Sequence, residues 1–567
     1  MAGALVSVTL GEYGPAVEAA VEEMQKNHVV RRIWKKDHTL WKPSPDDIAN
    51  RLGWLDSPGS MMGNIAEIQN FVNDVRTDGY THALLLGMGG SSLAPEVFRK
   101  TFGVAEGYLD LSVLDSTDPG AILAAVEKLD LTRTLFIVST KSGGTVETLS
   151  LFKYCYNRVQ EKTGASNAGD QFIAITDPGS SLAATAEKYN FRKIFLNDPD
   201  VGGRYSALTF FGLVPAALIG MDIRRLLETA QTALATELTE SEEFHKGVLS
   251  GIFLGAVLGE TAKAGRDKVT FFFSPQIESF GAWIEQLIAE SLGKEGKGIL
   301  PVVGEPLGNP SVYGNDRIFI FIGLKDDPDD EKKLAGLAEA GYPVIHILLD
   351  DLYSLGCQCL IWELATAVAG HLLAVNPFDQ PNVDTAKVLA RQMISDYAQK
   401  GSLPDDKPLV SEKGITVFGD VQGRNLADIL DAFFQQAKPG TYIALQAFIQ
   451  PTRQTRTALL ALQHHLRDKF KLAVTIGYGP RFLHSTGQLH KGDSGKGLFM
   501  QFTADSPGDL PIPDEAGEPG SAVTFGILKM AQVLGDGRAL VTAGRKVIRF
   551  HLGADTVRGL TLLAENL

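Results

Sequence analysis

The most constraining feature of this sequence is a repeated alternation of short apolar runs with longer helical patterns. From His82 onward, predicted strands occur at HALLLG, LSVLD, TLFIVST, QFIAITD and KIFLND, with helical patterns between several of them. Such alternation favours a parallel sheet covered by helices on both faces. A second block of this kind runs from KVTFFFS (Lys268 to Ser274) through RIFIFIGL and PVIHILL to a predicted helix around Cys357 to Leu373. The chain is therefore predicted to be α/β, with mainly parallel sheets.

The length indicates several domains. The chain has 567 residues, of which 44% are apolar, whereas one hydrophobic core stops growing at roughly 250 to 300 residues. We expect a helical segment over 1–60, a first α/β domain over 61–240, a second over 241–400 and a C-terminal α/β extension over 401–567. The strand candidates of the extension are GITVFGD, YIALQAFI, LAVTIGYG and GLFMQFT.

Local patterns refine this division. Apolar residues at three- and four-residue steps predict an opening helix from Pro15 to Trp34. Two further helical patterns, Ile223 to Leu238 and Glu242 to Ala264, are predicted to bridge the two sheets. The stretch from Lys400 to Lys413 contains glycine, prolines and aspartates, so we expect an exposed connection there.

Charge and cysteine content narrow the possible partners and the compartment. The net charge of −14 argues against nucleic acid or an anionic membrane surface as a partner. A phosphorylated small molecule remains compatible, since a few N–H groups, hydroxyls and cations suffice to bind it. The cysteines Cys155, Cys357 and Cys359 form no disulfide framework, and the last two fit core positions of an apolar helix. The N-terminal residues do not resemble a signal peptide, so we expect a soluble, cytoplasmic protein.

The first stretch with chemical character is LLLGMGGSSLAPEVF, residues 84–98. A buried strand leads into a turn containing Gly89, Gly90 and Ser91, and Pro95 lies where a helix begins. Glycines let backbone N–H groups approach an anion, serines add hydroxyl donors, and the helix N-terminus adds positive potential. The pattern favours phosphate binding over a dinucleotide fingerprint, whose third glycine is replaced here by serine.

The second stretch, FIVSTKSGGTVETLS at residues 136–150, also enters a helix through a loop of hydroxyls and glycines. Thr140, Lys141, Ser142 and Thr145 are candidates to surround a phosphate dianion. Two such loops at consecutive strand ends are rarely a coincidence, because open α/β sheets bind ligands at that edge. By itself, Lys141 is equally compatible with a solvated surface charge.

Together these loops resemble the sugar-phosphate-binding loops of the glucose-6-phosphate isomerase family. GGRYS (Gly202 to Ser206), EQLIAESLGK (Glu285 to Lys294) and NPFDQPNVDTAK (Asn376 to Lys387) also match the family's motifs, in the family's order. The resemblance covers about the first 400 residues. LGWLD near Trp54 and GPRFLHSTGQLHKG near His484 make the chain most similar to the isomerase half of bacterial transaldolase–isomerase fusions. The resemblance implies two sugar-isomerase (SIS-type) α/β sandwiches and a C-terminal extension.

The resemblance also implies roles for individual residues. Glu290 matches the base that moves a proton between adjacent carbons through a cis-enediol, and Gln286 matches a substrate-binding glutamine one turn earlier. Arg204 matches the arginine that stabilises the enediolate. Gln380 and Lys387 match the F-D-Q-x-x-x-x-x-x-K pattern, which implies contact between Lys387 and the ring oxygen or O5 during ring opening. The implied reaction is interconversion of glucose 6-phosphate and fructose 6-phosphate, in glycolysis and gluconeogenesis.

The sequence departs from the family pattern at the ring-opening histidine. No histidine occurs in GEPLGNPSVYGNDR, Gly304 to Arg317, where Tyr313 lies near the expected position. His346 and His371 fit core or packing positions. His484 and His490 lie in a polar, glycine-containing segment, and such loops often line sites. We therefore consider His484 or His490 as the replacement, with Tyr313 as the competing explanation.

The sequence contains no recognisable metal-binding motif, and the implied chemistry requires neither metal nor cofactor. Two alternatives remain open: an isomerase with dual phosphoglucose and phosphomannose specificity or for another phosphosugar, and a non-catalytic phosphosugar-binding regulator. The joint presence of Glu290, Arg204 and Lys387 argues against the regulator. The family implies a homodimer, and fusion to or association with a transaldolase is a further possibility.

Overall fold

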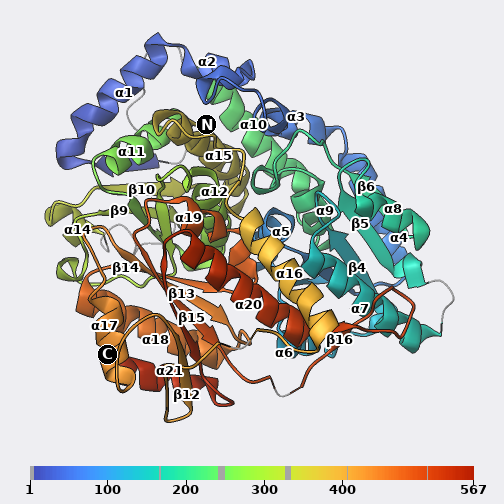
Figure 1. Ribbon diagram of the computed structural model, residues 1–567. Helices are drawn as coiled ribbons and strands as arrows, with labels where there is room; N and C mark the ends of the chain where they lie inside the picture. The colour runs from blue at the N-terminus through green and yellow to red at the C-terminus, as the bar shows by residue number, and fades with distance from the viewer. Residues whose placement is uncertain (1–4, 165–167, 240–249, 326–333, 405, 507) are drawn as a thin grey trace.

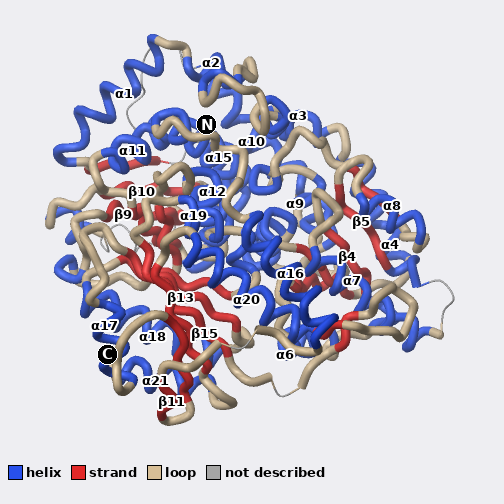
Figure 2. The backbone as a smooth tube through the Cα atoms, in the orientation of Figure 1, coloured by secondary structure: helices blue, strands red, loops and turns tan. Residues whose placement is uncertain are grey.

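Helices flank three sheets of five or six strands each (Figures 1 and 2). The computed structural model describes residues 5–164, 168–239, 250–325, 334–404, 406–506 and 508–567. Its α-helices are α1 Gly14–Lys26, α2 Val29–Trp34, α3 Ser57–Met62, α4 Ile65–Thr77, α5 Leu93–Phe102, α6 Pro119–Val126, α7 Val146–Thr163, α8 Ser181–Lys188, α9 Phe210–Leu218, α10 Ile223–Thr239, α11 Gly251–Lys263, α12 Phe280–Leu292, α14 Ala335–Glu339, α15 Leu355–Leu372, α16 Asp384–Lys400, α17 Leu426–Phe434, α18 Arg453–Phe470, α19 Gly487–Gly492, α20 Phe525–Thr542 and α21 Thr556–Glu565.

The first sheet is entirely parallel, with strand order β3-β2-β4-β5-β6. Its strands are β2 His82–Gly87, β3 Asp110–Leu114, β4 Thr134–Ser139, β5 Phe172–Thr176 and β6 Lys193–Leu196. All six residues of β4 and all five of β5 are buried, as expected for strands covered by helices on both faces. The predicted strands of this block are confirmed.

The second sheet has the order β1-β10-β9-β7-β8 and is parallel except at β1. Its strands are β1 Leu5–Thr9, β7 Lys268–Phe273, β8 Leu300–Val303, β9 Arg317–Leu324 and β10 Val344–Leu349. The three strands predicted here are confirmed as β7, β9 and β10. The strand β1, which pairs antiparallel with β10, lies within the segment predicted to be helical.

The third sheet belongs to the C-terminal extension and has the order β11-β12-β18-β15-β13-β14. Its strands are β11 Val410–Glu412, β12 Ile415–Gly419, β13 Tyr442–Phe448, β14 Ala473–Tyr478, β15 Gly497–Thr503 and β18 Lys546–His551. The four adjacent strands β18, β15, β13 and β14 are parallel. A short antiparallel pair, β16 Pro511–Ile512 and β17 Val523–Thr524, precedes α20.

Two predicted helices are corrected. The single helix expected from Pro15 to Trp34 is divided into α1 and α2, because His28 has a φ of 52° and left-handed residues cannot continue a right-handed helix. Of the pattern Glu242 to Ala264, α11 begins after the N-cap Ser250, whose hydroxyl accepts from the N–H of Phe253. Residues 240–249 lie outside the described residues.

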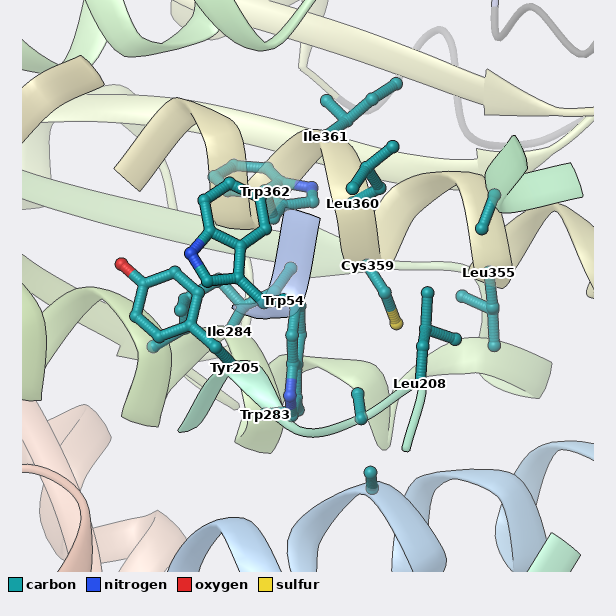
Figure 3. Packing of buried hydrophobic residues seen from close by; sticks show 14 of the residues in the cluster. Trp54, Tyr205, Leu208, Trp283, Ile284, Leu355, Cys359, Leu360, Ile361 and Trp362 are labelled. Carbon is teal, nitrogen blue, oxygen red and sulfur yellow. The ribbon is translucent and has the colours of Figure 1, made fainter. Parts of the chain in front are cut away.

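The first two sheets share one hydrophobic core, to which α9, α10, α12 and α15 contribute. Figure 3 shows Trp54, Tyr205, Trp283 and Trp362 gathered in this core. The rings of Trp54 and Tyr205 lie 5.3 Å apart, and both side chains are almost fully buried. Tyr205 follows Arg204 directly in the chain, so dense packing fixes the backbone that carries this arginine.

The segment Leu352–Leu372, which includes α15, is long and apolar enough to span a membrane, but 83% of its most apolar window is buried inside the protein. It packs against α10, α11 and α12. Cys357 and Cys359 are buried within it, which confirms the prediction that they are core residues. This segment is therefore accounted for as a core helix.

The C-terminal extension packs directly onto the rest of the chain. Figure 1 shows α20 beside α16, and the two helices are in contact; α19 packs on α12. A Cβ built on Gly293, at the end of α12, would lie 2.4 Å from the Cα of Leu489 in α19. The extension thus touches the helix that carries Glu290.

Candidate active site

The two loops rich in glycine and hydroxyls lie side by side at one edge of the first sheet. They follow β2 and β4, which are neighbouring strands with Gly87 opposite Ser139. The Ser139 hydroxyl donates to the carbonyl oxygen of Ser91 at 3.0 Å. The edge is formed by the carboxyl ends of the strands, where open α/β sheets bind ligands.

Gly89 and Gly90 allow other segments to approach the first loop closely. Gly89 has a φ of 55°, and a Cβ there would lie 2.8 Å from both the Gln286 amide nitrogen and the His484 carbonyl oxygen. A Cβ on Gly90 would lie 2.0 Å from the carbonyl oxygen of Gly203. The loop therefore joins the Arg204 segment, α12 and the C-terminal extension at one point, which requires glycine.

The second loop leaves the N-terminus of α7 open to an anion. Thr145 precedes the 18-residue helix but its side chain makes no capping bond; its hydroxyl instead lies 2.8 Å from that of Thr140. The Ser142 hydroxyl accepts from the N–H of Gly144 at 3.3 Å. Uncapped N–H groups and the helix dipole attract phosphate, and the neighbouring hydroxyls add donors.

Lys141 is oriented away from this group. Its ammonium forms an ion pair with Asp177 and donates to the carbonyl oxygen of Pro199 at 2.8 Å. Both acceptors come from segments that follow β5 and β6. In this structure the charge of Lys141 is paired with Asp177, and its place around a dianion stays a prediction.

Glu290 lies between an amide and a guanidinium. Its Oε2 accepts from the Gln286 amide at 3.0 Å, and its Oε1 lies 3.6 Å from Nη1 of Arg204. Gln286 precedes it by one turn of α12, as the spacing predicted. The Glu290 side chain is 13% exposed, which leaves the carboxylate accessible while most of it is shielded.

The guanidinium of Arg204 is fixed on all its edges. Nε donates to the Ser291 hydroxyl at 2.7 Å, and Nη1 donates to the Gln380 side-chain oxygen at 2.8 Å. Nη2 donates to the carbonyl oxygens of Pro377 at 2.7 Å and Asp379 at 2.9 Å. These contacts bring the Gln380 segment to the predicted Arg204, and they hold a cation beside Glu290 that needs no reorientation.

Lys294, the last residue of the AESLGK motif, is a site neighbour that sequence reasoning did not assign. It is 1% exposed and donates to Oδ1 of Asp379 at 2.7 Å. Burial, followed by the charge of Arg204, lowers its pKa to about 8, although Asp379 and Glu290 oppose this shift. Its place at the end of the motif that carries Glu290 was the available signal.

His484 enters the site through both its backbone and its ring. Its carbonyl oxygen accepts from the Gln286 amide at 2.8 Å, and its Nε2 lies 2.9 Å from Oε1 of Glu147. Burial alone would raise the pKa of Glu147. The charge of His484 and its hydrogen bond to Glu147 hold this pKa below its usual value, with a smaller effect of Lys387. Glu147 was missed as a functional residue, although it belongs to the second loop motif.

The other candidates for ring opening lie elsewhere. His490 is 2% exposed, its ring packs against those of Phe482 and Phe499, and burial holds its pKa well below the usual range. Tyr313 is also buried, packs on Phe319, and its hydroxyl accepts from the N–H of Gly308. The structure brings His484 to Gln286, whereas His490 and Tyr313 have core environments.

Lys387 lies at the exposed start of α16. Its ammonium is 3.3 Å from Asp384, and its side chain is 46% exposed. Its charge nevertheless acts on Glu147. His346 is buried in β10, and the ring of His371 lies 2.7 Å from the Leu40 carbonyl oxygen, in accord with their predicted packing roles.

A cleft of about 320 Å³ lies beside α12. Its lining includes Glu285, Asp115 and Arg481, but neither Glu290 nor Arg204. Burial raises the pKa of Glu285 to about 7. This cleft is therefore separate from the group of residues around Glu290.

Comparison with known proteins identifies the family. Residues 60–299 match the model for phosphoglucose isomerase. A glucose-6-phosphate isomerase of Prochlorococcus marinus (strain MIT 9215) is 30% identical over 426 residues, which cover 67% of this chain and 78% of that protein. One from Methanocaldococcus jannaschii is 26% identical over 354 residues, covering 56% and 85%.

Solved structures agree in fold. A glucose-6-phosphate isomerase from Chlamydia trachomatis superposes with a TM-score of 0.58 at 18% identity, covering 70% of this chain and 90% of its own. A hypothetical protein from Thermus thermophilus gives 0.59 at 25% identity, covering 68% and 99%. With the sequence matches and the α/β architecture, these findings lead to one conclusion: the chain belongs to the glucose-6-phosphate isomerase family.

Proposed function

We propose that this protein interconverts glucose 6-phosphate and fructose 6-phosphate by proton transfer through a cis-enediol. The observation that carries the proposal is the position of Glu290, whose carboxylate lies between the Gln286 amide and the fixed guanidinium of Arg204. Isomerisation of this kind requires one base beside the carbon chain and one cation beside the enediolate oxygens. The names of the relatives point to the same substrate pair.

The proposed sequence of events starts at the phosphate. The Ser91 loop, the hydroxyls of Thr140, Ser142 and Thr145 and the N-terminus of α7 bind it. After the ring has opened, Glu290 removes the proton from C2 and returns it to C1, and a proton passes from O2 to O1. Arg204 stabilises the negative oxygen that develops in between. Because Arg204 is held by carbonyl and side-chain oxygens, its charge is in place before the reaction begins.

Ring opening is assigned to the pair formed by His484 and Glu147. Protonation of the ring oxygen and removal of the hydroxyl proton require a group that exchanges protons near neutrality, which suits an imidazole. The carboxylate of Glu147 orients the ring and supports its charged form, as in other imidazole–carboxylate pairs. Lys387, from α16, provides a further positive charge near this pair.

A coupled assay of glucose 6-phosphate formation from fructose 6-phosphate tests the proposal directly. We expect turnover without added metal, and a parallel assay with mannose 6-phosphate measures the specificity at C2. Absence of isomerisation of either hexose phosphate by folded protein would contradict the proposed function. We further propose a cytoplasmic homodimer, which sedimentation and fractionation can test. Association with a transaldolase is a separate proposal, tested by co-purification.

A further inference from the structure

The C-terminal extension contributes a second contact to the Glu147 carboxylate. Gln532, on α20, donates from Nε2 to Oε1 of Glu147 at 2.7 Å. The oxygen of the same amide accepts from the Thr117 hydroxyl at 2.9 Å. Gln532 and Glu147 are each 4% exposed and Thr117 is fully buried, so water does not replace these bonds.

The chemistry of the three groups fixes the direction of the chain of bonds. An ionised carboxylate only accepts, so the amide must present its NH₂ group to Glu147. The amide oxygen then faces Thr117, whose hydroxyl can donate to it. The opposite amide orientation would place two acceptor oxygens, those of Gln532 and Glu147, in contact, which is unfavourable.

Glu147 Oε1 therefore accepts two hydrogen bonds, one from Gln532 and one from His484. The second donor stabilises the carboxylate charge and restrains the carboxylate plane. Without it, Glu147 would be a stronger base toward the imidazole and freer to rotate. Both effects change how readily His484 gives up and regains a proton.

We infer that Gln532 is a positioning residue, which holds Glu147 ionised and oriented so that His484 can exchange protons with the sugar ring. The inference rests on the proposed function, because it assigns ring opening to His484. The residue that positions Glu147 thus lies in α20, outside the residues that match the family's motifs. Gln532 itself does not contact His484 in any bond that the structure records.

Several charged groups surround this arrangement. His484 approaches Glu147 from the segment before α19, and Lys387 approaches from α16 with Asp384 beside it. One turn earlier on α20, Lys529 pairs with Asp118 at 2.8 Å. Gln532 has no charge of its own. A carboxylate introduced at this position would therefore be the one titratable group added next to Glu147.

The variant Gln532→Glu uses this property. It keeps the size of the side chain, and its protonated form can still donate one hydrogen bond to Glu147. Two adjacent carboxyls share a proton, so one pKa is raised, and that proton is lost as pH increases. We expect the ratio of variant to wild-type kcat on the cyclic hexose phosphate to be highest near pH 6 and to fall about tenfold by about pH 8.

A second variant, Gln532→Leu, removes both hydrogen bonds at every pH. We expect kcat on the cyclic sugar to fall about tenfold, the size typical of one charge-assisted bond. A four-carbon aldose 4-phosphate has no free hydroxyl able to close a stable ring. Exchange of its C2 proton with deuterium from solvent, followed by NMR, should therefore remain within about twofold of wild type.

Gln463→Glu is the matched control, because Gln463 is also a buried glutamine of the extension but donates to the Val474 carbonyl oxygen. It should lower the melting temperature without the pH-dependent change in the kcat ratio. If Gln532→Leu does not fold, two other variants test the role of Gln532. They are Gln532→Glu and Thr117→Val, the second of which replaces the Thr117 hydroxyl by a methyl group. In Thr117→Val, kcat on the cyclic sugar should fall by less than in Gln532→Leu, and proton exchange on the open-chain substrate should not change.

A pH-independent ratio for Gln532→Glu, or equal losses on cyclic and open-chain substrates in the variants that fold, would overturn the inference. Failure of the proposed function is recognised separately, because the folded wild-type protein would then isomerise neither hexose phosphate. If Glu290→Gln is inactive while the Gln532 variants behave like wild type, only the role of Gln532 is wrong.

Discussion

At the scale of single residues, Arg204 is notable for how little of its position depends on Glu290. Carbonyl oxygens of Pro377 and Asp379 and the Ser291 hydroxyl hold its guanidinium. The contact to Glu290 is longer, at 3.6 Å. Removing the Glu290 charge should therefore leave the arginine in place, so substitutions at 290 test proton transfer rather than the architecture of the site.

Glu290→Gln retains the size of the side chain but cannot accept a proton. We expect kcat to fall by about 100-fold or more with KM little changed. Steady-state kinetics in the coupled assay measure both constants. Glu285→Gln, on the cleft side of the same helix, is the control and should keep near-normal kcat. Wild-type turnover by Glu290→Gln would rule out its role as the base.

Ser142→Ala combined with Thr145→Ala removes two hydroxyls from the loop that begins α7. If this loop binds phosphate, KM should rise, because charge-assisted hydrogen bonds contribute about 1.5 to 3 kcal/mol each. Inhibition by 6-phosphogluconate should weaken in parallel. Unchanged affinity for both compounds in the double variant would place the phosphate elsewhere.

The lowered pKa of Lys294 predicts how the free energy of unfolding depends on pH. Its pKa is about 8 in the folded protein and near its ordinary 10.5 when unfolded. Between these values the unfolded chain binds more protons, so the contribution of Lys294 to the free energy of unfolding rises with pH. Urea unfolding of wild type and Lys294→Met at pH 7 and pH 10 measures this. The difference, wild type minus variant, should increase; a constant or falling difference contradicts it.

At the scale of elements, His484 lies in the segment before α19 and His490 lies within α19, and the two histidines have different surroundings. His484 contacts Glu147, whereas His490 lies among aromatic rings with its Nδ1 3.3 Å from the Gln446 amide. His484→Ala should slow turnover of the cyclic sugar but leave C2 proton exchange on an open-chain substrate. His490→Ala should lower the melting temperature and affect the two substrates equally. Full cyclic activity in His484→Ala would make this segment structural.

Elements with long apolar runs could be predicted from sequence, and short or polar-faced ones could not. The buried strands β4 and β9 have uninterrupted apolar patterns, which identify parallel strands. The strand β1 has five residues and is paired by β10, more than 300 residues away, so no local pattern indicated it. The break at His28, a residue with left-handed φ, was likewise not predicted, because no proline or glycine marks it in the sequence.

Some residues of the candidate site could likewise be predicted from the sequence, and others could not. Glu290, Arg204 and Gln380 could be placed because motifs carry them, and the structure brings these three together. Glu147 has a motif signal that was not used. Gln532 has none, because its relation to Glu147 depends on the docking of α20, 385 residues further along the chain. The neutralisation of Lys141 by Asp177 is also a tertiary effect.

At the scale of the whole molecule, the extension is not an independent attachment. Ala516, Phe525 and Leu528 belong to the same core cluster as β2, β4 and α7 of the first sheet. Phe525 is fully buried and packs edge-on against Tyr154 of α7. This shared core predicts that the extension and the first sheet unfold together.

Phe525→Ala tests this coupling. Truncation of a buried phenylalanine costs about 3 to 5 kcal/mol, so calorimetry should show a lower melting temperature. Isomerase activity should be lost over the same temperature range as the calorimetric transition. Val541→Ala, at a position 60% exposed on the same helix, should leave both nearly unchanged. An early transition of the extension that leaves the activity of the remaining protein intact would contradict the shared core.

The position of His484 in the extension also has a consequence for protein synthesis. Nearly 200 residues separate Glu290 from His484, and Gln532 follows later still. At a translation rate of about 5 to 20 residues per second, the phosphate loops and the base leave the ribosome roughly 10 to 40 seconds before the histidine. Because Phe525 and Leu528 complete the core of the first sheet, the phosphate loops can be held in their final positions only after the extension has also left the ribosome.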